Sequence, residues 1–273
     1  MIQFSNCKIN LGLHITHKRS DGYHNIQTIF YPIPFYDVLE VITSNQFQFT
    51  STGLIINGNA NNNLCVKAYN LLKNDYPNLP PLHLHLHKNI PMGAGIGGGS
   101  ANATNTLQLL NATYNLQIDQ KQLLAYAAVL GSDCPFFVHN TPCFAQGRGE
   151  ILTPLQIDLS SYVIVLIFSN IAISTANAFA HIIPSEPASN LQQTILQPIT
   201  TWQHSLTNDF EKSIFPQYPE LQTTKNKLYQ LGAVYASMSG SGSTVYGLFY
   251  KNNFLNNTIS ENFTLHKILN SNT

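Results

Sequence analysis

The segment that most restricts the fold is Pro91-Met-Gly-Ala-Gly-Ile-Gly-Gly-Gly-Ser-Ala101, in which five of the eleven residues are glycine. Glycine lets backbone N–H groups turn inward and approach a ligand without Cβ clashes. Alternating Leu and His at 82–87 predict a half-buried strand before this loop, and small and apolar residues from Ser100 predict a helix after it. The N–H groups and positive dipole end of that helix would meet the loop. This order predicts a phosphate cradle. The alternative, a tight structural turn, does not need five glycines.

Two better-known nucleotide motifs fit this loop less well. A Walker A loop needs Gly-Lys-Ser/Thr, and the sequence has no such tripeptide. Gly93, Gly95 and Gly98 match the G-x-G-x-x-G spacing of dinucleotide-binding dehydrogenases, with Asp119 about where a ribose-binding acid would lie. However, the preceding strand alternates, whereas a central parallel strand is continuously apolar. Asp119 and Gln122 also make a capping box for the next helix. A dehydrogenase is therefore a distant alternative.

The remaining segments predict strands and helices in mixed order. Strands are expected within 13–50, at 162–168, and on both sides of the Ser-Met-Ser-Gly-Ser-Gly-Ser segment between 234 and 249. Helices are expected at 63–74, 120–130, 190–206 and 219–231, and 132–140 predicts a turn followed by a short strand. This mixture favours an α+β fold over a doubly wound sheet. The length allows two modest domains, with a weakly marked boundary that gives 1–155 and 156–273.

Charge and cysteine content exclude several classes of protein. The chain carries 13 basic and 13 acidic residues, whereas a nucleic-acid binder is normally basic. The four cysteines form no C-x-x-C pair, which favours free thiols in a reducing cytosol. Lys8 interrupts the N-terminal apolar residues, so a signal peptide is not expected, and the longest apolar run is too short to span a bilayer. We therefore expect a cytoplasmic protein with no nucleic-acid or membrane partner.

Several segments resemble the GHMP kinases, the family of galactokinase, homoserine kinase and mevalonate kinase. The loop and the residues after it, PMGAGIGGGSANA, look like the phosphate loop of that family. Three further regions agree in order and spacing, namely CKINLGLHITHKRSDGYHNIQTIF at 7–30, LGSDCPFFV at 130–138, and TNDFE at 207–211 with SMSGSGSTV at 237–245. The resemblance implies a ribosomal-protein-S5-like N-terminal domain that binds ATP and a ferredoxin-like C-terminal domain. It is closest to the members that phosphorylate a methylerythritol linked to cytidine diphosphate.

The resemblance assigns catalytic roles to Lys8 and Asp133. Asp133 would accept the proton of the substrate hydroxyl as that hydroxyl attacks the γ-phosphate of ATP. Lys8 would keep this carboxylate ionised and stabilise developing charge. From the residues alone, Asp133 could equally be a solvated acid on a turn, and Lys8 a lysine that reaches solvent from a strand.

The resemblance also assigns residues to the substrate. Tyr23 would stack on the cytosine ring and His24 would hydrogen-bond to the base edge, although Asp21–His24 alone predicts only a surface turn. Asn10 would share a strand face with Lys8 and lie near the substrate. Phe30 and Phe179 would complete an aromatic pocket, and Thr175 would add a polar contact.

The expected ATP-binding residues comprise one lysine and the whole loop. They are Lys88, Pro91, Met92, Gly93, Ala94, Gly95, Ile96, Gly97, Gly98, Gly99, Ser100 and Ala101. Lys88 could also be a strand-end surface lysine, and the second Gly/Ser segment could close over the site or be a flexible hairpin. Where the resembled kinases have Ser-Ser-Asn-Ala, this chain has Ser100-Ala101-Asn102-Ala103, so Ser100 or backbone groups would replace the missing hydroxyl.

No protein metal site is expected, and Mg²⁺ would arrive with ATP. His83, His85 and His87 share one strand face, which suggests a metal, but no carboxylate or cysteine joins them in the sequence. The expected activity is ATP-dependent phosphorylation of the 2-hydroxyl of the cytidine diphosphate-linked methylerythritol, a step of the non-mevalonate isoprenoid pathway. The alternatives are a homoserine- or mevalonate-type GHMP kinase and a non-catalytic binding protein of the same fold. A monomer or weak homodimer is expected.

Overall fold

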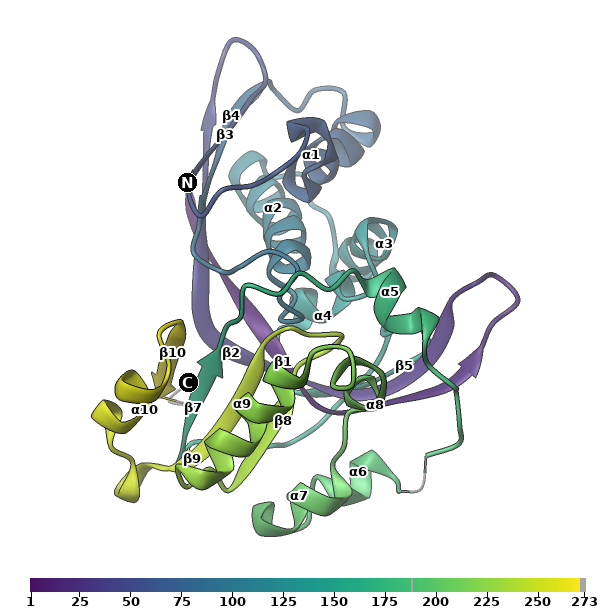
Figure 1. Cartoon of the computed structure of the whole chain (residues 1–273). Coiled ribbons are helices and arrows are strands. Elements are labelled where there is room, and N and C mark those ends of the chain that lie inside the picture. The colour runs from purple at the N-terminus through teal and green to yellow at the C-terminus, as the bar shows by residue number, and fades with distance from the viewer. Residues whose placement is uncertain (188, 271–273) are drawn as a thin grey trace. The chain divides into compact units, whose positions relative to one another are not determined.

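A computed structural model describes residues 1–187 and 189–270, which form two compact units built from alternating segments of the chain. Unit 1 contains Met1–Cys7, Phe35–Met92 and Gly97–Thr141. Unit 2 contains Lys8–Pro34, Gly93–Ile96 and the described residues from Pro142 onward. Two long strands, β1 (Ile2–Lys18) and β2 (His24–Thr43), contribute residues to both units (Figure 1). The mixture of sheets and helices confirms the α+β prediction, and the division at 155/156 stays a prediction about family domains.

In unit 1, α-helices pack against a small sheet (Figure 1). Residues 38–43 of β2 pair antiparallel with β4 (Leu82–Lys88), and β4 pairs in parallel with β3 (Gln48–Gly53). The leucines of β4 are buried in a core shared with the helices, which confirms the predicted half-buried strand. The helical elements are η1 (Ala60–Asn62), α1 (Leu64–Asp75), α2 (Gly98–Tyr114), α3 (Gln120–Leu130) and α4 (Cys134–His139).

The histidines of β4 lie on the face opposite that core. Their rings alternate with the hydroxyls of Thr50 and Thr52 on β3, through hydrogen bonds of 2.7–2.9 Å. Each threonine hydroxyl bridges two neighbouring histidines, so the row is a hydrogen-bonded ladder. Within residues 1–187 and 189–270, no group of three or more His, Cys, Asp or Glu is arranged to hold a metal ion.

Helix ends in unit 1 follow local sequence signals. Asn63 caps α1, and Asp119 with Gln122 forms the predicted capping box of α3. The predicted turn is present at Ser132–Asp133, but the prediction of a short strand after it was wrong, because Cys134–His139 is a helix. The apolar run after Pro135 suggested a strand, but proline in the first turn of a helix loses no backbone hydrogen bond and has a suitable φ.

Unit 2 is built around a four-stranded antiparallel sheet with the order β10-β7-β9-β8. The connection from β7 to β8 contains the helical elements from α5 to α9, and α10 connects β9 to β10, which is the ferredoxin-like arrangement. Residues 28–30 of β2 pair with β5, and β5 pairs with β6. The elements are β5 (Cys143–Gln146), β6 (Ile151–Pro154), β7 (Tyr162–Ile167), α5 (Thr175–Ala180), α6 (Leu191–Thr194), η2 (Ile199–Thr201), α7 (Trp202–Ser205), α8 (Phe210–Ile214), α9 (Pro219–Gln230), β8 (Tyr235–Met238), β9 (Val245–Tyr250), η3 (Lys251–Asn253), α10 (Asn256–Asn262) and β10 (His266–Asn270).

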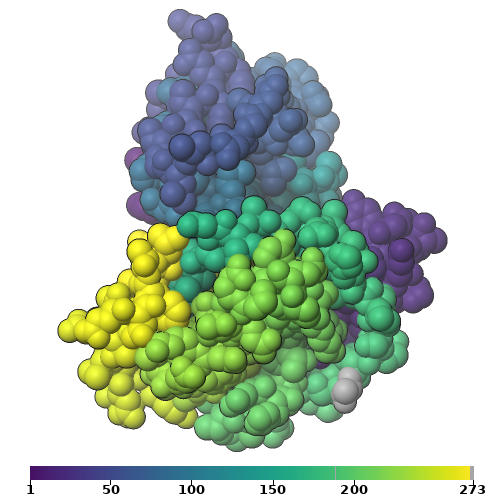
Figure 2. Space-filling view, in the orientation of Figure 1, coloured from purple at the N-terminus to yellow at the C-terminus, as the bar shows by residue number. Residues whose placement is uncertain are grey.

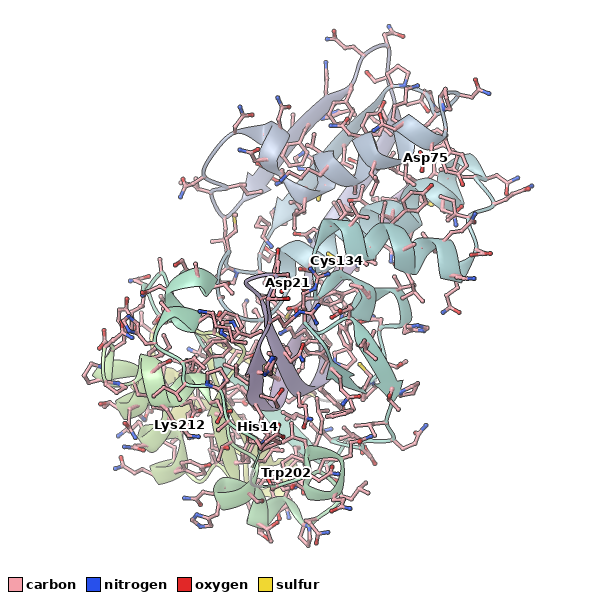
Figure 3. All side chains as sticks on the ribbon, turned by 90° about the vertical axis from the view of Figure 1, so that its right-hand side faces the viewer. His14, Asp21, Asp75, Cys134, Trp202 and Lys212 are labelled. Atoms are coloured by element: carbon pink, nitrogen blue, oxygen red, sulfur yellow. The ribbon has the colours of Figure 1, made fainter. Side chains whose placement is uncertain are left out.

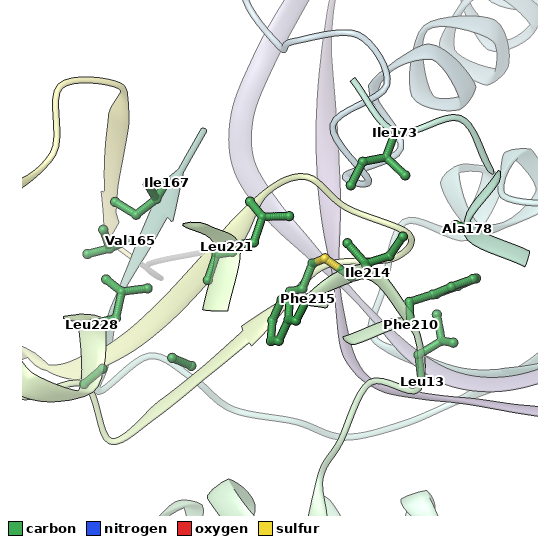
Figure 4. Packing of buried hydrophobic residues seen from close by; sticks show 14 of the residues in the cluster. Leu13, Val165, Ile167, Ile173, Ala178, Phe210, Ile214, Phe215, Leu221 and Leu228 are labelled. Carbon is green, nitrogen blue, oxygen red and sulfur yellow. The ribbon is translucent and has the colours of Figure 1, made fainter. Parts of the chain in front are cut away.

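The core of unit 2 joins residues far apart in the sequence. Leu13 from β1 packs with Ile173, Phe210 and Ile214 (Figure 4). The yellow C-terminal residues lie beside the light-green residues of the same unit in Figure 2. The predicted helix at 190–206 is interrupted, because Pro198 lies between α6 and η2 and cannot continue a helix. In the described ranges, no helix has the length and apolar character needed to cross a membrane.

Candidate functional site

The glycine-rich loop ends at the N-terminus of α2, as predicted, although this helix begins at Gly98 rather than Ser100. Gly97 is the N-cap, with a left-handed φ of 71°, and its lack of a side chain leaves the first-turn N–H groups uncapped. An added Cβ at Gly98 would lie 2.7 Å from Ile90 Cγ2 and 3.2 Å from Lys88 Nζ. This end of α2 can therefore receive an anion, and it packs too closely against Lys88–Ile90 for a side chain at position 98.

Asp37 on β2 contacts both ends of the loop. Its Oδ1 accepts hydrogen bonds from the backbone N–H groups of Asn89 (2.7 Å) and Ile90 (2.8 Å), just before Pro91. Its Oδ2 accepts one from Asn102 Nδ2 (2.9 Å), in the first turns of α2, and forms an ion pair with Lys88. The side chains of Asp37 and Lys88 are 0% and 2% exposed. Lys88, predicted to bind ATP, is thus paired within unit 1.

Asp133 lies next to the start of α2 in unit 1. It occupies the N-cap position of α4, where its side chain does not cap the helix. The Ser100 hydroxyl hydrogen-bonds to the thiol of Cys134, and Thr104 Oγ1 donates to the Cys134 carbonyl at 2.8 Å (Figure 3 labels Cys134). Burial, reinforced by the Asp133 carboxylate, raises the pKa of the Cys134 thiol to about 11. The thiol is therefore neutral, and Asp133 is an acidic group beside the first turn of α2.

Ala101, the residue that departs from the resembled motif, is fully buried in α2. Its methyl group packs into the interior of unit 1, so this position offers no group to a ligand. Ser100 supplies the hydroxyl at this end of the helix.

Unit 2 holds Lys8 and Asn10 in a hydrogen-bonded chain. Lys8 is 3% exposed, and its Nζ donates to Asn10 Oδ1 at 2.6 Å and lies 4.7 Å from the centre of the Phe30 ring. Asn10 Nδ2 donates to Thr28 Oγ1 at 2.9 Å, and this hydroxyl donates to the Gly12 carbonyl at 2.5 Å. Because the single hydroxyl proton of Thr28 goes to Gly12, Thr28 must accept from Asn10. The Asn10 amide is thereby oriented with its oxygen toward Lys8.

The segment Gly93–Ile96 is packed against the second Gly/Ser loop of unit 2. Ser239 Oγ donates to the Gly95 carbonyl at 3.0 Å and accepts from the Asn10 backbone N–H at 3.2 Å. Gly95 has a φ of +76°, and an added Cβ there would collide with the Ser239 carbonyl. Ser239–Gly242 is therefore an ordered support for the loop tip and not a free hairpin.

The residues at 207–211 hold this second loop in place. Asn208 Nδ2 donates to the carbonyls of Met238 and Gly240, both at 2.8 Å. Glu211 accepts from Ser237 Oγ and Met238 N. Asp209 accepts from the Ile15 N–H of β1 at 3.0 Å and from its partners His14 and Lys212, both labelled in Figure 3. Burial opposes the charge on Asp209, but these hydrogen bonds lower its pKa to about 2.

The aromatic residues expected near a base lie at the turn between β1 and β2. Tyr23 is 54% exposed, and the Arg148 guanidinium lies 4.9 Å from the centre of its ring. His24 stacks on Phe179 of α5 with ring centres 4.7 Å apart and an interplanar angle of 12°. Burial, with a contribution from Lys18, lowers the pKa of His24, which favours the neutral ring.

The two remaining predicted substrate residues differ in exposure. Thr175 is exposed at the first position of α5. Phe30 is buried, and its ring lies beneath Lys8 instead of opening a surface.

Each unit thus gathers part of the predicted site, and residues absent from the prediction support both parts. Unit 1 brings the loop ends together with Asp133, and unit 2 brings Lys8 and Asn10 together with the loop tip. Asp37 and Thr28 were missed. For Asp37, one signal was available: in the alternating strand FYDVLEV it falls at an inward position, between Phe35 and Leu39, where an apolar residue is expected.

Comparisons with known proteins show the family to which this chain belongs. Residues 63–141 match the GHMP kinases N terminal domain, and residues 190–258 match the GHMP kinases C terminal domain. The chain therefore belongs to the GHMP kinase family, as the segments from 7 to 245 predicted.

Within the family, relatives with one name align over almost the whole chain. A protein of Azobacteroides pseudotrichonymphae named 4-diphosphocytidyl-2-C-methyl-D-erythritol kinase is 50% identical over 252 residues, covering 92% of this chain and 94% of its own. A protein of the same name from Bacteroides fragilis is 49% identical over 253 residues, covering 91% and 92%.

Solved structures extend the comparison to the fold. The crystal structure of a 4-(cytidine 5'-diphospho)-2C-methyl-D-erythritol kinase matches with a TM-score of 0.75 and 30% identity, over 91% of this chain and 90% of that chain. The mevalonate kinase of Methanococcus jannaschii matches with a TM-score of 0.72 at 15% identity, over 98% and 96%. The latter likeness shows a shared fold alone.

Proposed function

We propose that this chain is a kinase that transfers the γ-phosphoryl group of ATP to the 2-hydroxyl of 4-diphosphocytidyl-2-C-methyl-D-erythritol, in the non-mevalonate pathway to isoprenoid precursors. One observation carries this proposal: the uncapped glycine cradle at α2 occurs in a chain half identical to relatives with that name. We further propose a cytoplasmic location, a monomer or weak homodimer, and no nucleic-acid or membrane partner.

The loop residues would bind the phosphates of ATP. The backbone N–H groups of Gly97–Ser100 and the positive end of α2 suit the β- and γ-phosphates. Mg²⁺ fits an arrangement in which few protein ligands are needed, because this ion binds mainly to phosphates and water. Ser100 and Asp133 carry side-chain oxygens at this end of α2 and would be the protein groups beside the ion. When bound, the ion neutralises phosphate charge.

Asp133 and Lys8 would carry the chemical step. The oxygen of the substrate 2-hydroxyl forms a bond to the γ-phosphorus, and the bond from this phosphorus to the oxygen of the leaving ADP breaks. Asp133 accepts the proton that the hydroxyl releases. Lys8, oriented by Asn10, stabilises negative charge as it develops. The buried position of Lys8 supports this role because a cation acts more strongly away from water.

The turn after β1 would recognise the cytidine. The exposed Tyr23 ring offers a stacking surface, and the stacked pair His24–Phe179 presents a neutral imidazole that can both donate and accept hydrogen bonds. Thr175 and Asn10 add polar groups for the remainder of the substrate, and Phe30 supports Lys8 from below.

A phosphotransfer assay with ATP-Mg²⁺ tests the proposal, using the cytidyl substrate beside homoserine and mevalonate. We expect phosphorylation of the cytidyl compound alone. Turnover of homoserine or mevalonate without the cytidyl compound would instead support another GHMP kinase, and no turnover with intact ATP binding would support a binding protein of this fold.

Replacement of Asp133 tests the assignment of the base. Asp133→Ala should abolish turnover and largely retain ADP binding, as measured by calorimetry. Unchanged turnover would remove Asp133 from the mechanism. Asp119→Ala is the matched control, because it also removes an acid at a helix N-cap but lies away from α2's first turn.

A further inference from the structure

We infer that Asp37 is a positioning residue that sets the separation of the two stems of the phosphate loop, Lys88–Ile90 before it and Asn102 after it. This inference rests on the proposed nucleotide binding and adds a residue that lies outside the loop itself. Asp37 touches no substrate in this assignment and acts through the residues that it holds.

All the acceptor capacity of the Asp37 carboxylate is directed at the stems. A carboxylate has about four acceptor sites. Asp37 receives Asn89 N and Ile90 N on Oδ1, and Asn102 Nδ2 and Lys88 Nζ on Oδ2. One rigid planar group therefore connects the last residues of β4 and the residues that follow it to the beginning of α2.

A purely structural role would not require this acid. Asp37 lies in a strand position with no exposure, where an apolar side chain would avoid the cost of burying a charge. Asn102 also turns its amide toward Asp37 and is itself buried, although it follows the loop directly. Gly98 packs against the same stem, where any Cβ would press on Ile90. The two stems are thus fixed at a short separation, which orders the glycine N–H groups before a nucleotide binds.

Pre-ordering of a flexible glycine loop should appear in affinity. Glycine has more conformational freedom to lose than other residues, so a loop with loose stems would pay its ordering cost at the moment of binding. We expect Asp37→Asn, which places an amide NH₂ against Lys88 and Asn102, to weaken ADP binding about tenfold or more, comparable with the loss of one strong hydrogen bond.

The experiment combines ADP calorimetry with hydrogen exchange of the Asn89 and Ile90 amides. Leu72→Ala is the control, because it opens a cavity at a fully buried core position of unit 1 that belongs to α1 and to neither stem. In Asp37→Asn both amides should lose protection and ADP affinity should fall, while Leu72→Ala should keep both. Unchanged affinity in a folded Asp37→Asn protein, or an equal loss in Leu72→Ala, would overturn the inference.

A second variant covers the case in which Asp37→Asn does not fold. Asn102→Ala removes the two hydrogen bonds that join Asn102 to Asp37 and Lys88, and it leaves the pair Asp37–Lys88 intact, so ADP affinity should fall by a smaller factor, about threefold to tenfold. Full ADP affinity in Asn102→Ala would contradict the bridging role. If the unsubstituted protein bound no ADP, the proposed function would fail, whereas loss of amide protection in either variant would still establish the bridge.

Discussion

The orientation of the Asn10 amide gives a direct test of how Lys8 is prepared for its proposed role. Thr28→Val keeps the shape of the side chain and removes the hydroxyl that fixes this amide. The amide must then either leave Nδ2 buried without its acceptor, or turn Nδ2 toward the Lys8 ammonium. In both orientations the Asn10 amide loses one hydrogen bond with a buried or charged group, in addition to the bond from Thr28 to the Gly12 carbonyl.

Such a loss is worth about 1.5–3 kcal/mol. At 1.36 kcal/mol per factor of ten, kcat should fall by roughly 10- to 150-fold if Lys8 stabilises charge mainly in the transition state. The KM for ATP should change little, because the glycine loop is not altered. Steady-state kinetics with the cytidyl substrate separate the two parameters.

Two controls isolate the hydroxyl of Thr28. Thr28→Ser restores the donor and acceptor and should recover most of the turnover. Thr106→Val removes another fully buried threonine hydroxyl, one that donates to the Asn102 carbonyl at 2.8 Å, and should leave kcat nearly intact. A Thr28→Val enzyme with unchanged kcat, or an equal loss in Thr106→Val, would refute the reasoning.

Three further outcomes are expected. Tyr23→Ala should raise the KM for the cytidyl substrate by roughly 5- to 150-fold, the worth of one base stacked on an aromatic ring, and leave the KM for ATP unchanged; an unaltered KM would contradict stacking. Gly95→Ala should reduce both the urea midpoint of unfolding and the affinity for ADP, because Gly95 has a φ of +76° and an added Cβ would meet Ser239. Gly232→Ala is the control: Gly232 has a φ of +96° but nothing lies within 4 Å of an added Cβ, so only the urea midpoint should fall. The pKa of Asp209 is lowered from 3.8 to about 2, so its stabilising contribution is complete above about pH 4 and is lost as the pH falls through 2. Asp209→Asn should therefore flatten the decrease in unfolding free energy between about pH 4 and pH 2. An unchanged pH dependence in this range would exclude Asp209 as its source.

Local signals in the sequence were sufficient for much of the fold. The alternation at 82–87, the capping box at Asp119 and the glycine run before α2 each depend on residues close together in the chain, and each is present in the structure. The short helix at Cys134–His139 was missed because its aromatic and β-branched residues are typical of a strand. The break at Pro198 was missed because the spacing of apolar residues over 190–206 was given more weight than the single proline within it.

The supports of the site were harder to predict because they depend on pairing between distant segments. Asp37 is 51 residues from Lys88, and Asn10 is 229 residues from Ser239. No local pattern reports such contacts. A charged residue at an inward strand position, as at Asp37, marks that a partner must exist but does not say where in the chain it lies.

The alternation of chain segments between the two units limits how this protein can be divided. Unit 2 needs β1 and the first half of β2, since Leu13, Ile15 and Ile26 belong to its core, yet these residues precede most of unit 1 in the chain. A fragment that starts at Pro142 would therefore present an apolar surface where those side chains belong. For the same reason, a chimera made by exchanging one contiguous block with a relative would have to match both cores at once. Protein engineers should expect interior contacts, more than loop lengths, to decide which crossovers fold.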